Sequence, residues 1–219
     1  MKLNSEDVAQ YLYEHPEFFE EYAPMLAEIQ VSDSYSGRAI PISERQILAL
    51  REKNRILHNR LSELIGFGEE NDAITEKMHR LTVALLTFTR LNDFLHGLNV
   101  GLRELFSVPH TALRIWNMTS DDPGLAAFTA VTTETHTMAE NLQRPYCGPH
   151  VPDEIRNWFG ESAAHLRSFA MVALRREQTI GLLVMGSEDP ERFYPEMGTI
   201  YLTHLGELAS ATLGRFRTD

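Results

Sequence analysis

The sequence has one cysteine, Cys147, among its 219 residues, and it has no long apolar run. A single cysteine excludes an internal disulfide and the multi-cysteine zinc sites, and it favours the reducing cytoplasm. The most apolar stretches, 169–174 and 182–185, are far shorter than the roughly 20 residues of a membrane-spanning helix. The N-terminus turns acidic at Glu6 and Asp7, where a signal peptide would be apolar. We therefore expect a cytoplasmic protein without a membrane span.

Basic residues are also scarce, with 20 Lys and Arg against 31 Asp and Glu and a net charge of −11. Phosphate contacts need clustered Lys and Arg, so nucleic-acid binding is disfavoured. The charge is uneven, however, because residues 1–30 are acidic and residues 45–60 are basic, an asymmetry that two subunits could use. The acidic residues are Glu6, Asp7, Glu14, Glu17, Glu20, Glu21 and Glu28, against Lys2; the basic ones are Arg45, Arg51, Lys53, Arg55 and Arg60, against Glu52.

Motifs for metal binding or catalysis are missing. No two of the nine histidines are spaced four apart, as two ligands on one helix face would be. No glycine-rich phosphate loop is present. His150 follows Cys147 by three residues and could act as the base for a thiolate. Cys147 thus has three interpretations, a reactive thiol, a residue lining a pocket or a plain buried cysteine. We expect no metal and no catalytic residue.

A heptad-spaced apolar series follows Ser43, which we expect to cap a long helix. Asn54 occupies an a-type position in this series, where a polar residue can set register and oligomeric state. The series predicts a dimeric coiled coil, and a single helix lying on its own core is the alternative. Gly66 and Gly68 weaken the helix, and we expect the next helix at 74–106. The predicted dimer seam is Ile47, Leu50, Asn54, Leu57, Leu61 and Leu64.

From residue 111 the pattern becomes that of strands. Two strands are predicted at 111–116 and 128–133, and a hairpin of nearly apolar strands is predicted at 169–175 and 179–187, typical of strands covered on both faces. A loop at 141–152 and a short helix at 153–159 separate these pairs, and Pro195 opens a closing helix. This order describes an α+β domain with a central antiparallel sheet. Helices cover one face, the 134–160 segment crosses the other, and a pocket can form beneath it.

Strand alternation suggests which residues line such a pocket. If Leu113 and Ile115 face the helices, Arg114 and Trp116 face the crossing segment, where an arginine beside an indole can hold an anionic or aromatic ligand. A solvated Arg114 and a Trp116 that plugs the face are the alternative. The candidate pocket residues are Arg114, Trp116, Tyr146, Cys147, Phe159 and Met171.

Two sets of residues resemble known families. The segment 168–214 resembles the closing part of the GAF fold, a PAS-related domain that senses small molecules; it reads SFAMVALRREQTIGLLVMGSEDPERFYPEMGTIYLTHLGELASATLG. Four ordered pieces resemble the bacterial family catalogued as domain of unknown function 484; they are VAQYLYEHPEFFEEY, ISERQILALREKNRILHNRLSELI, RPYCG and GLLVMGSEDPERFYPEMGTIYLTHLGEL. This resemblance implies a GAF-like C-terminal domain behind a helical N-terminal region and supplies no accepted activity. GAF-like methionine sulfoxide reductases use several cysteines, and bilin-binding relatives place His directly after Cys, where this chain has Gly148.

The sequence therefore predicts three parts: short helices at 1–37, a long pairing helix at 38–73 and a GAF-like domain at 74–219. We expect a non-enzymatic, cytoplasmic sensory or regulatory protein that forms a homodimer and binds an unidentified small molecule. Because the sequence ends at Asp219, just past the last predicted helix, we expect the N-terminal helices to pass the signal to a protein partner. A structural adaptor with a self-filled pocket is the second interpretation, and an enzyme using Cys147 is the third.

Overall fold

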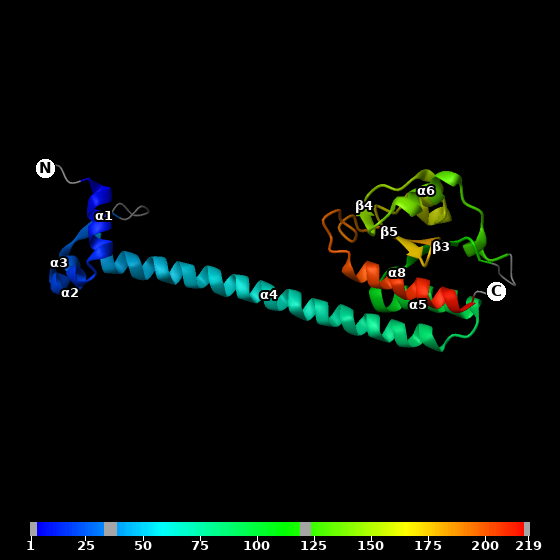
Figure 1. Cartoon of the computed structure of the whole chain (residues 1–219), viewed down its shortest axis with the longest axis horizontal. Helices are drawn as coiled ribbons and strands as arrows, with labels where there is room; N and C mark the ends of the chain where they lie inside the picture. The colour runs from blue at the N-terminus through cyan, green and yellow to red at the C-terminus, as the bar shows by residue number, and fades with distance from the viewer. Residues whose placement is uncertain (1–3, 33–38, 119–123, 217–219) are drawn as a thin grey trace. The chain divides into compact units, whose positions relative to one another are not determined.

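The computed structural model of the chain describes residues 4–32, 39–118 and 124–216. The chain divides into two compact units, Met1–Glu69 and Glu70–Asp219, and helix α4 (Ile42–Thr87) contributes to both (Figure 1). Pro16 separates the first two helices. The first unit begins with α1 (Ser5–Glu14), α2 (Glu17–Glu21), α3 (Ala23–Glu28) and an antiparallel pair of short strands, β1 (Gln30–Ser32) and β2 (Ala39–Pro41).

Helix α4 is uninterrupted, which corrects three sequence predictions. It starts at Ile42, so Ser43 lies within its first turn and does not cap it. Gly66 and Gly68 lie inside it, because their cost of about 1 kcal/mol each is small against the turns on either side. The break falls instead at residues 88–90, so the helix predicted at 74–106 is the end of α4 followed by α5 (Leu91–Phe106). Breaking there lets Leu81 and Leu85 of α4 join the α5 residues in one core.

The second unit is built around a four-stranded antiparallel sheet. The predicted hairpin of β5 (Ser168–Arg175) and β6 (Thr179–Ser187) forms its centre and is buried almost throughout, as expected for strands covered on both faces. The edge strands are β3 (His110–Ile115) and β4 (Tyr146–Gly148), in the order β3-β6-β5-β4. β4 lies within the predicted loop at 141–152, because three residues between prolines are too few to show a strand pattern.

The strand predicted at 128–133 is wrong. These residues follow the short 3₁₀ helix η1 (Ala126–Phe128) and lead into α6 (Thr133–Asn141). The β-branched residues suggested a strand, but the Thr132 side chain accepts a hydrogen bond from the backbone N–H of Thr135 and so caps α6. The predicted closing helix begins later than Pro195, as α8 (Ile200–Leu213). The remaining elements are α7 (Asp153–Asn157), η2 (Gly160–Ala164) and η3 (Gly214–Phe216).

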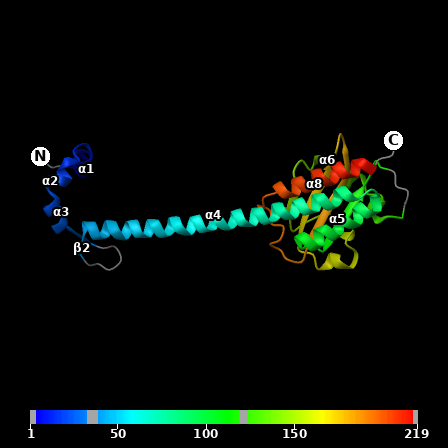
Figure 2. The ribbon, with the colours of Figure 1, turned by 90° about the horizontal axis from the view of Figure 1, so that it is seen from below.

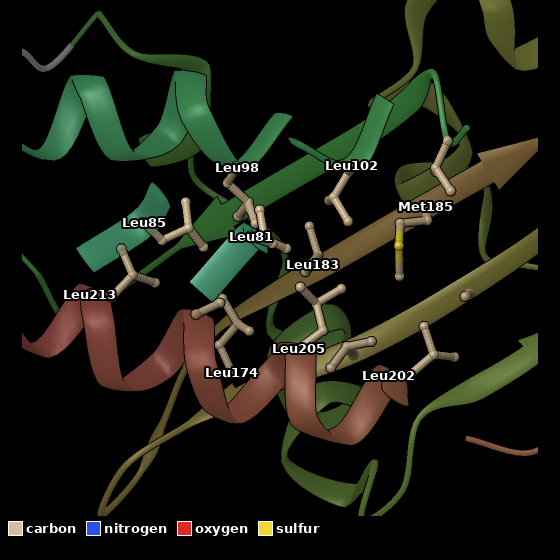
Figure 3. Packing of buried hydrophobic residues seen from close by; sticks show 14 of the residues in the cluster. Leu81, Leu85, Leu98, Leu102, Leu174, Leu183, Met185, Leu202, Leu205 and Leu213 are labelled. Atoms are coloured by element: carbon tan, nitrogen blue, oxygen red, sulfur yellow. The ribbon is translucent and has the colours of Figure 1, made fainter. Parts of the chain in front are cut away.

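Helices cover both faces of the sheet. Figure 1 shows α6 on one side of the strands and α5 and α8 on the other, and Figure 2 shows the end of α4 between α8 and α5. The helix-face core joins leucines of these three helices to the sheet (Figure 3), and its labelled residues are Leu81, Leu85, Leu98, Leu102, Leu174, Leu183, Met185, Leu202, Leu205 and Leu213. The opposite core lies beneath the 134–160 segment, so the predicted two-sided cover is confirmed. In the part of the chain that the structure describes, no helix is long and apolar enough to cross a bilayer.

Gly181 provides a test of the sheet register. A Cβ atom at this position would lie 2.6 Å from the backbone oxygen of Arg114 on the neighbouring strand, and backbone cannot move aside as a flexible side chain does. We expect Gly181→Ala to lower the free energy of unfolding by about 2 kcal/mol in urea titrations. Gly198→Ala is the matched control, because a Cβ there meets no atom within 4 Å. Equal effects of the two substitutions would contradict the register.

Candidate functional site

The predicted alternation along β3 is confirmed. Leu113 and Ile115 contact the helix-face core, whereas Trp116 packs against the core on the opposite face. Trp116 donates a hydrogen bond from Nε1 to the backbone oxygen of Thr179 over 2.8 Å, and its ring meets the His136 ring edge-on at 4.5 Å between centroids. This bond fixes the indole against the sheet edge.

Arg114 lies beneath α7 with its guanidinium only partly satisfied. Its central carbon is 4.8 Å from the ring centroid of Trp158, and Nη1 donates to the backbone oxygen of Leu113 over 3.0 Å. Burial lowers the pKa of Arg114, and the nearby Glu154 carboxylate opposes this effect. In the described part of the chain, Nε of Arg114 is the only buried side-chain nitrogen or oxygen without a hydrogen-bond partner. A buried donor without an acceptor costs about 1–3 kcal/mol.

Glu154 joins α7 to the start of α6. Its carboxylate accepts hydrogen bonds from the backbone N–H of Thr132 over 3.0 Å and from the hydroxyl of Thr132 over 2.5 Å, and a third comes from the hydroxyl of Thr135. Burial alone would raise the pKa of Glu154, but these hydrogen bonds and the charge of Arg114 together hold it below its usual value. Glu154 therefore stays ionised and holds the two covering helices together.

Four of the six candidate pocket residues meet on the face beneath the crossing segment. Met171 is buried there with Leu182 and Val184 of the sheet and Ile155 of α7. The side chains that pack against this core include three other candidates and a second tryptophan; they are Trp116, Tyr146, Phe159 and Trp158. Arg114 lies at the same face through its contact with Trp158. The protein's own side chains thus occupy much of the space under the crossing segment.

Cys147 is separated from the other five candidates. Tyr146 pairs with Met171 and Cys147 with Ala170, so the pleat directs Cys147 to the helix-face core. Its side chain is only 6% exposed, and burial raises the pKa of its thiol. A nucleophilic cysteine needs the opposite shift. The register of β4 decides this placement, and β4 was not predicted.

A cavity lies outside the predicted pocket. It has a volume of about 250 Å³ and opens on the helix face between the end of α4, the end of α5 and the start of α8. Its walls are mostly apolar and include Met78, Phe106, Met185, Phe193 and Met197. None of the six candidate residues lines it. Among the described residues, no group of three His, Cys, Asp or Glu is arranged to hold a metal ion.

The seam of α4 is the other candidate site, and its apolar side chains lie in water. Leu57 is 64% exposed and Leu61 is 54% exposed. Asn54, one turn before Leu57, is also exposed. Ile47, Leu50 and Leu64 are exposed as well. The coiled coil and the single helix lying on its own core both remain predictions for this stretch. Its apolar side chains are exposed in the chain as described.

Sequence reasoning missed Glu154 and the hydroxyl groups that it binds. An acidic residue next to Asp153 in the first turn of a short helix is an ordinary helix-start signal, and it does not reveal a partner 22 positions away.

At neutral pH we expect Glu154→Ala to lower the free energy of unfolding by about 1 kcal/mol, because Thr132 and Thr135 lose their shared acceptor.

The pH dependence gives this prediction its sign. A carboxyl whose pKa is lowered by folding stabilises the protein above its unfolded pKa of about 4.3 and loses this contribution as the pH falls through the folded value. The difference between wild type and Glu154→Ala should therefore vanish in acid urea titrations. The exposed Glu161→Ala is the control, and a difference that persists at low pH would contradict the network.

Comparisons with known proteins place this geometry in context. No curated protein shows significant sequence similarity to the chain. The chain is similar in structure to a free methionine-R-sulfoxide reductase from Neisseria meningitidis solved in complex with its substrate, with 17% identity, a TM-score of 0.50 and coverage of 65% of this chain and 89% of the other. A second similar structure is the GAF domain of an Acinetobacter phosphoenolpyruvate-protein phosphotransferase, with 14% identity, a TM-score of 0.49 and coverage of 64% of this chain and 92% of the other. A third is residues 122 to 287 of a methyl-accepting chemotaxis protein, with 11% identity, a TM-score of 0.43 and coverage of 64% of this chain and 98% of the other.

The predicted α+β class and GAF-like fold are confirmed, with the antiparallel sheet and the helices on both of its faces as the structural basis. The family described as "Protein of unknown function, DUF484" matches residues 1–218, which is nearly the whole chain. The chain therefore belongs to the DUF484 family.

Proposed function

We propose that this protein is a non-enzymatic cytoplasmic regulator that binds a small molecule beside Arg114 and signals to a partner protein through a homodimer of α4 helices. The observation that carries the ligand part is the buried Nε of Arg114, which lacks an acceptor. A ligand that supplies this acceptor would remove the cost of an unsatisfied buried donor.

The surroundings of Arg114 favour a ligand with a small anionic group. A guanidinium binds carboxylate and phosphate oxygens well because its N–H groups form a planar fork. The Trp158 ring already stacks near this fork, and Trp116 packs against the same face, so an aromatic part of a ligand would find a matching surface. The substrate complex of the Neisseria meningitidis reductase supports the view that this fold accommodates a small molecule.

The non-enzymatic part of the proposal rests on Cys147. The similar reductase does not transfer its chemistry to this chain, because the buried thiol has a raised pKa and no second cysteine exists to resolve an oxidised one. His150, the base that the sequence suggested, is exposed whereas Cys147 is buried. A thiol enzyme is therefore the weakest of the three interpretations.

The homodimer part rests on the exposed seam of α4. Contiguous apolar side chains in water mark an interaction surface, and heptad spacing matches a second helix of the same kind. The same helix contributes Leu81 and Leu85 to the helix-face core. The sheet separates this core from the Arg114 side, so the proposed signal passes through the sheet to the helix-face core and from there shifts the pairing of α4.

A structural adaptor is the second candidate function, and one observation favours it. Trp116, Tyr146, Trp158 and Phe159 already pack against the core beneath the crossing segment, which is what a self-filled pocket requires. The adaptor would keep the α4 dimer and the protein partner without responding to a ligand. Ligand binding therefore separates the two functions.

A thermal-shift screen tests the ligand site. Using small aromatic carboxylates, aliphatic carboxylates and nucleotides as probes, we expect at least one to raise the melting temperature of the wild type. Arg114→Ala should abolish this rise and leave the unliganded melting temperature nearly unchanged, because it removes an unsatisfied donor together with a ring contact. The exposed Arg167→Ala should keep the rise.

Two results would contradict the ligand site. If no probe stabilises the wild type, the adaptor is preferred. If Arg114→Ala keeps the full rise, the ligand binds elsewhere, and the helix-face cavity lined by Met78 and Met185 becomes the site to examine.

Light scattering tests the dimer. We expect the wild type to be a dimer at micromolar concentration and the variant Leu57→Glu, Leu61→Glu to be a monomer, because four carboxylates would enter an apolar seam. The control variant Asn59→Glu, Ser62→Glu adds the same charge to the same turns away from the seam and should remain dimeric. A monomeric wild type would refute the coiled coil.

A further inference from the structure

The first two helices of the chain leave their apolar side chains in water. Neither α1 nor α2 contains a buried residue, although both are rich in aromatic residues. Tyr13 is 88% exposed, and Val8, Tyr11, Phe19 and Tyr22 are exposed as well. Their ring contacts are local: Phe18 stacks on Tyr22 at 4.7 Å and Tyr11 on His15 at 4.3 Å between ring centroids. Helices this short are marginal without tertiary packing, so α1 and α2 need a surface to cover them.

These helices are also strongly acidic and lack cationic partners. Glu17, Glu20 and Glu21 of α2 are exposed, and within the described residues no ion pair joins α1 or α2 to a basic side chain. Residues 1–30 as a whole hold seven acidic residues and one lysine. A surface that covers α1 and α2 must therefore be both apolar and basic.

The first half of α4 has both properties. With Ile47 and Asn54 as a positions of the heptad, Arg51 takes an e position and Lys53 and Arg60 take g positions. All three are exposed and have no ion pair in the structure as described. In natural coiled coils the e and g positions carry complementary charges. Between residues 45 and 60, a homodimer of α4 alone brings only positive charge to its e and g positions.

Apolar side chains also lie beside the seam. Leu48 is 49% exposed and Ile56 is 40% exposed, and they occupy b and c positions, which a two-helix seam leaves in water. A pair of α4 helices therefore still leaves Leu48 in water beside Arg51, and Ile56 in water between Lys53 and Arg60. These apolar side chains with basic neighbours match the aromatic, acidic α1 and α2 in both hydrophobicity and charge.

We propose that the acidic helices α1 and α2 of one protomer dock on the basic flank of α4, residues 45–60, in a second copy of the chain. The proposal deepens the proposed function, because it rests on the α4 homodimer and adds the surface that completes it. It turns a two-helix seam into a larger interface and explains the opposite charges of the two segments.

The length of the chain permits this docking. A hydrogen bond from the Ile42 N–H to the Ile29 oxygen over 3.3 Å ties the end of the segment after α3 to the start of α4, so α1 and α2 depart from the beginning of that helix. Paired helices lie about 8–10 Å apart, and the partner's basic flank is therefore within reach of these helices. Two outcomes compete with this proposal. Either α1 and α2 dock on α4 of their own chain, or the basic flank of α4 binds nucleic acid.

Charge reversal on each side tests the proposal in the full chain. One variant carries Glu17→Lys, Glu20→Lys and Glu21→Lys, and the other carries Arg51→Glu, Lys53→Glu and Arg60→Glu. In the second variant the flanks of the seam remain alike in charge, so repulsion between the two α4 helices is unchanged and only docking is lost. We expect sedimentation equilibrium to show each variant dimerising at least about tenfold more weakly than the wild type.

Mixing the two variants identifies the chain that is docked on. In a mixed dimer, the basic α2 of one chain meets the acidic flank of the other, and the acidic α2 of the other meets a native basic flank. An equimolar mixture should therefore recover the wild-type affinity to within about threefold. The two α4 flanks also attract each other in this mixture, so its affinity is compared with that of a mixture of the α4 variant and the wild type, in which the flanks attract equally. Docking on the partner predicts that the first mixture is the tighter one, whereas docking within one chain predicts that it is not.

A variant with three charge reversals in the second unit is the control. Glu161→Lys, Glu177→Lys and Glu196→Lys change the net charge as the α2 variant does, at exposed positions of the second unit, and should leave dimerisation unchanged. Circular dichroism checks that helix content is retained. Dimers unaffected by either reversal would overturn this proposal while leaving the α4 homodimer intact. A wild type that is monomeric would instead overturn the proposed function. Binding of duplex DNA that the α4 reversal abolishes, without a change in dimerisation, would assign the flank to nucleic acid.

Discussion

The apolar seam of α4 is the constraint on which the rest of the structure depends. Leu57 and Leu61 lie in water, whereas Leu81 and Leu85 of the same helix are buried against the sheet. A contiguous apolar surface in water marks an interaction site. We propose a second copy of the chain as its cover, because the seam has heptad spacing with Asn54 at an a position. In the proposed dimer, the acidic first helices and the basic flank of α4 belong to a single interface.

The sheet of the second unit separates two cores with different properties. The helix-face core is mostly aliphatic, with many leucines, and contains Cys147. The opposite core contains Trp116 and Trp158 and lies next to Arg114. On this second side Glu154 ties α6 to α7, and the Nε of Arg114 lacks an acceptor. A ligand that completes this side would act on the helices that cover it.

Periodicity in the sequence was enough to predict the elements that depend on local pattern. The apolar runs predicted the hairpin of β5 and β6, and alternation placed Arg114 and Trp116 on the correct face of β3. The strand predicted at 128–133 failed because the hydroxyl of Thr132 caps a helix, an effect that outweighs β-branched composition. The placement of Cys147 failed because it depends on the register of β4, a strand of three residues. The role of Glu154 was not predicted, because its hydrogen-bond partners come from a distant part of the chain.

Native mass spectrometry of the freshly purified full chain tests the central claim most directly, because it reports the oligomeric state and any retained ligand together. The account predicts a species at twice the chain mass of 25.0 kDa, with an added small mass when ligand is retained. A 25.0 kDa monomer as the only species at micromolar concentration would contradict it.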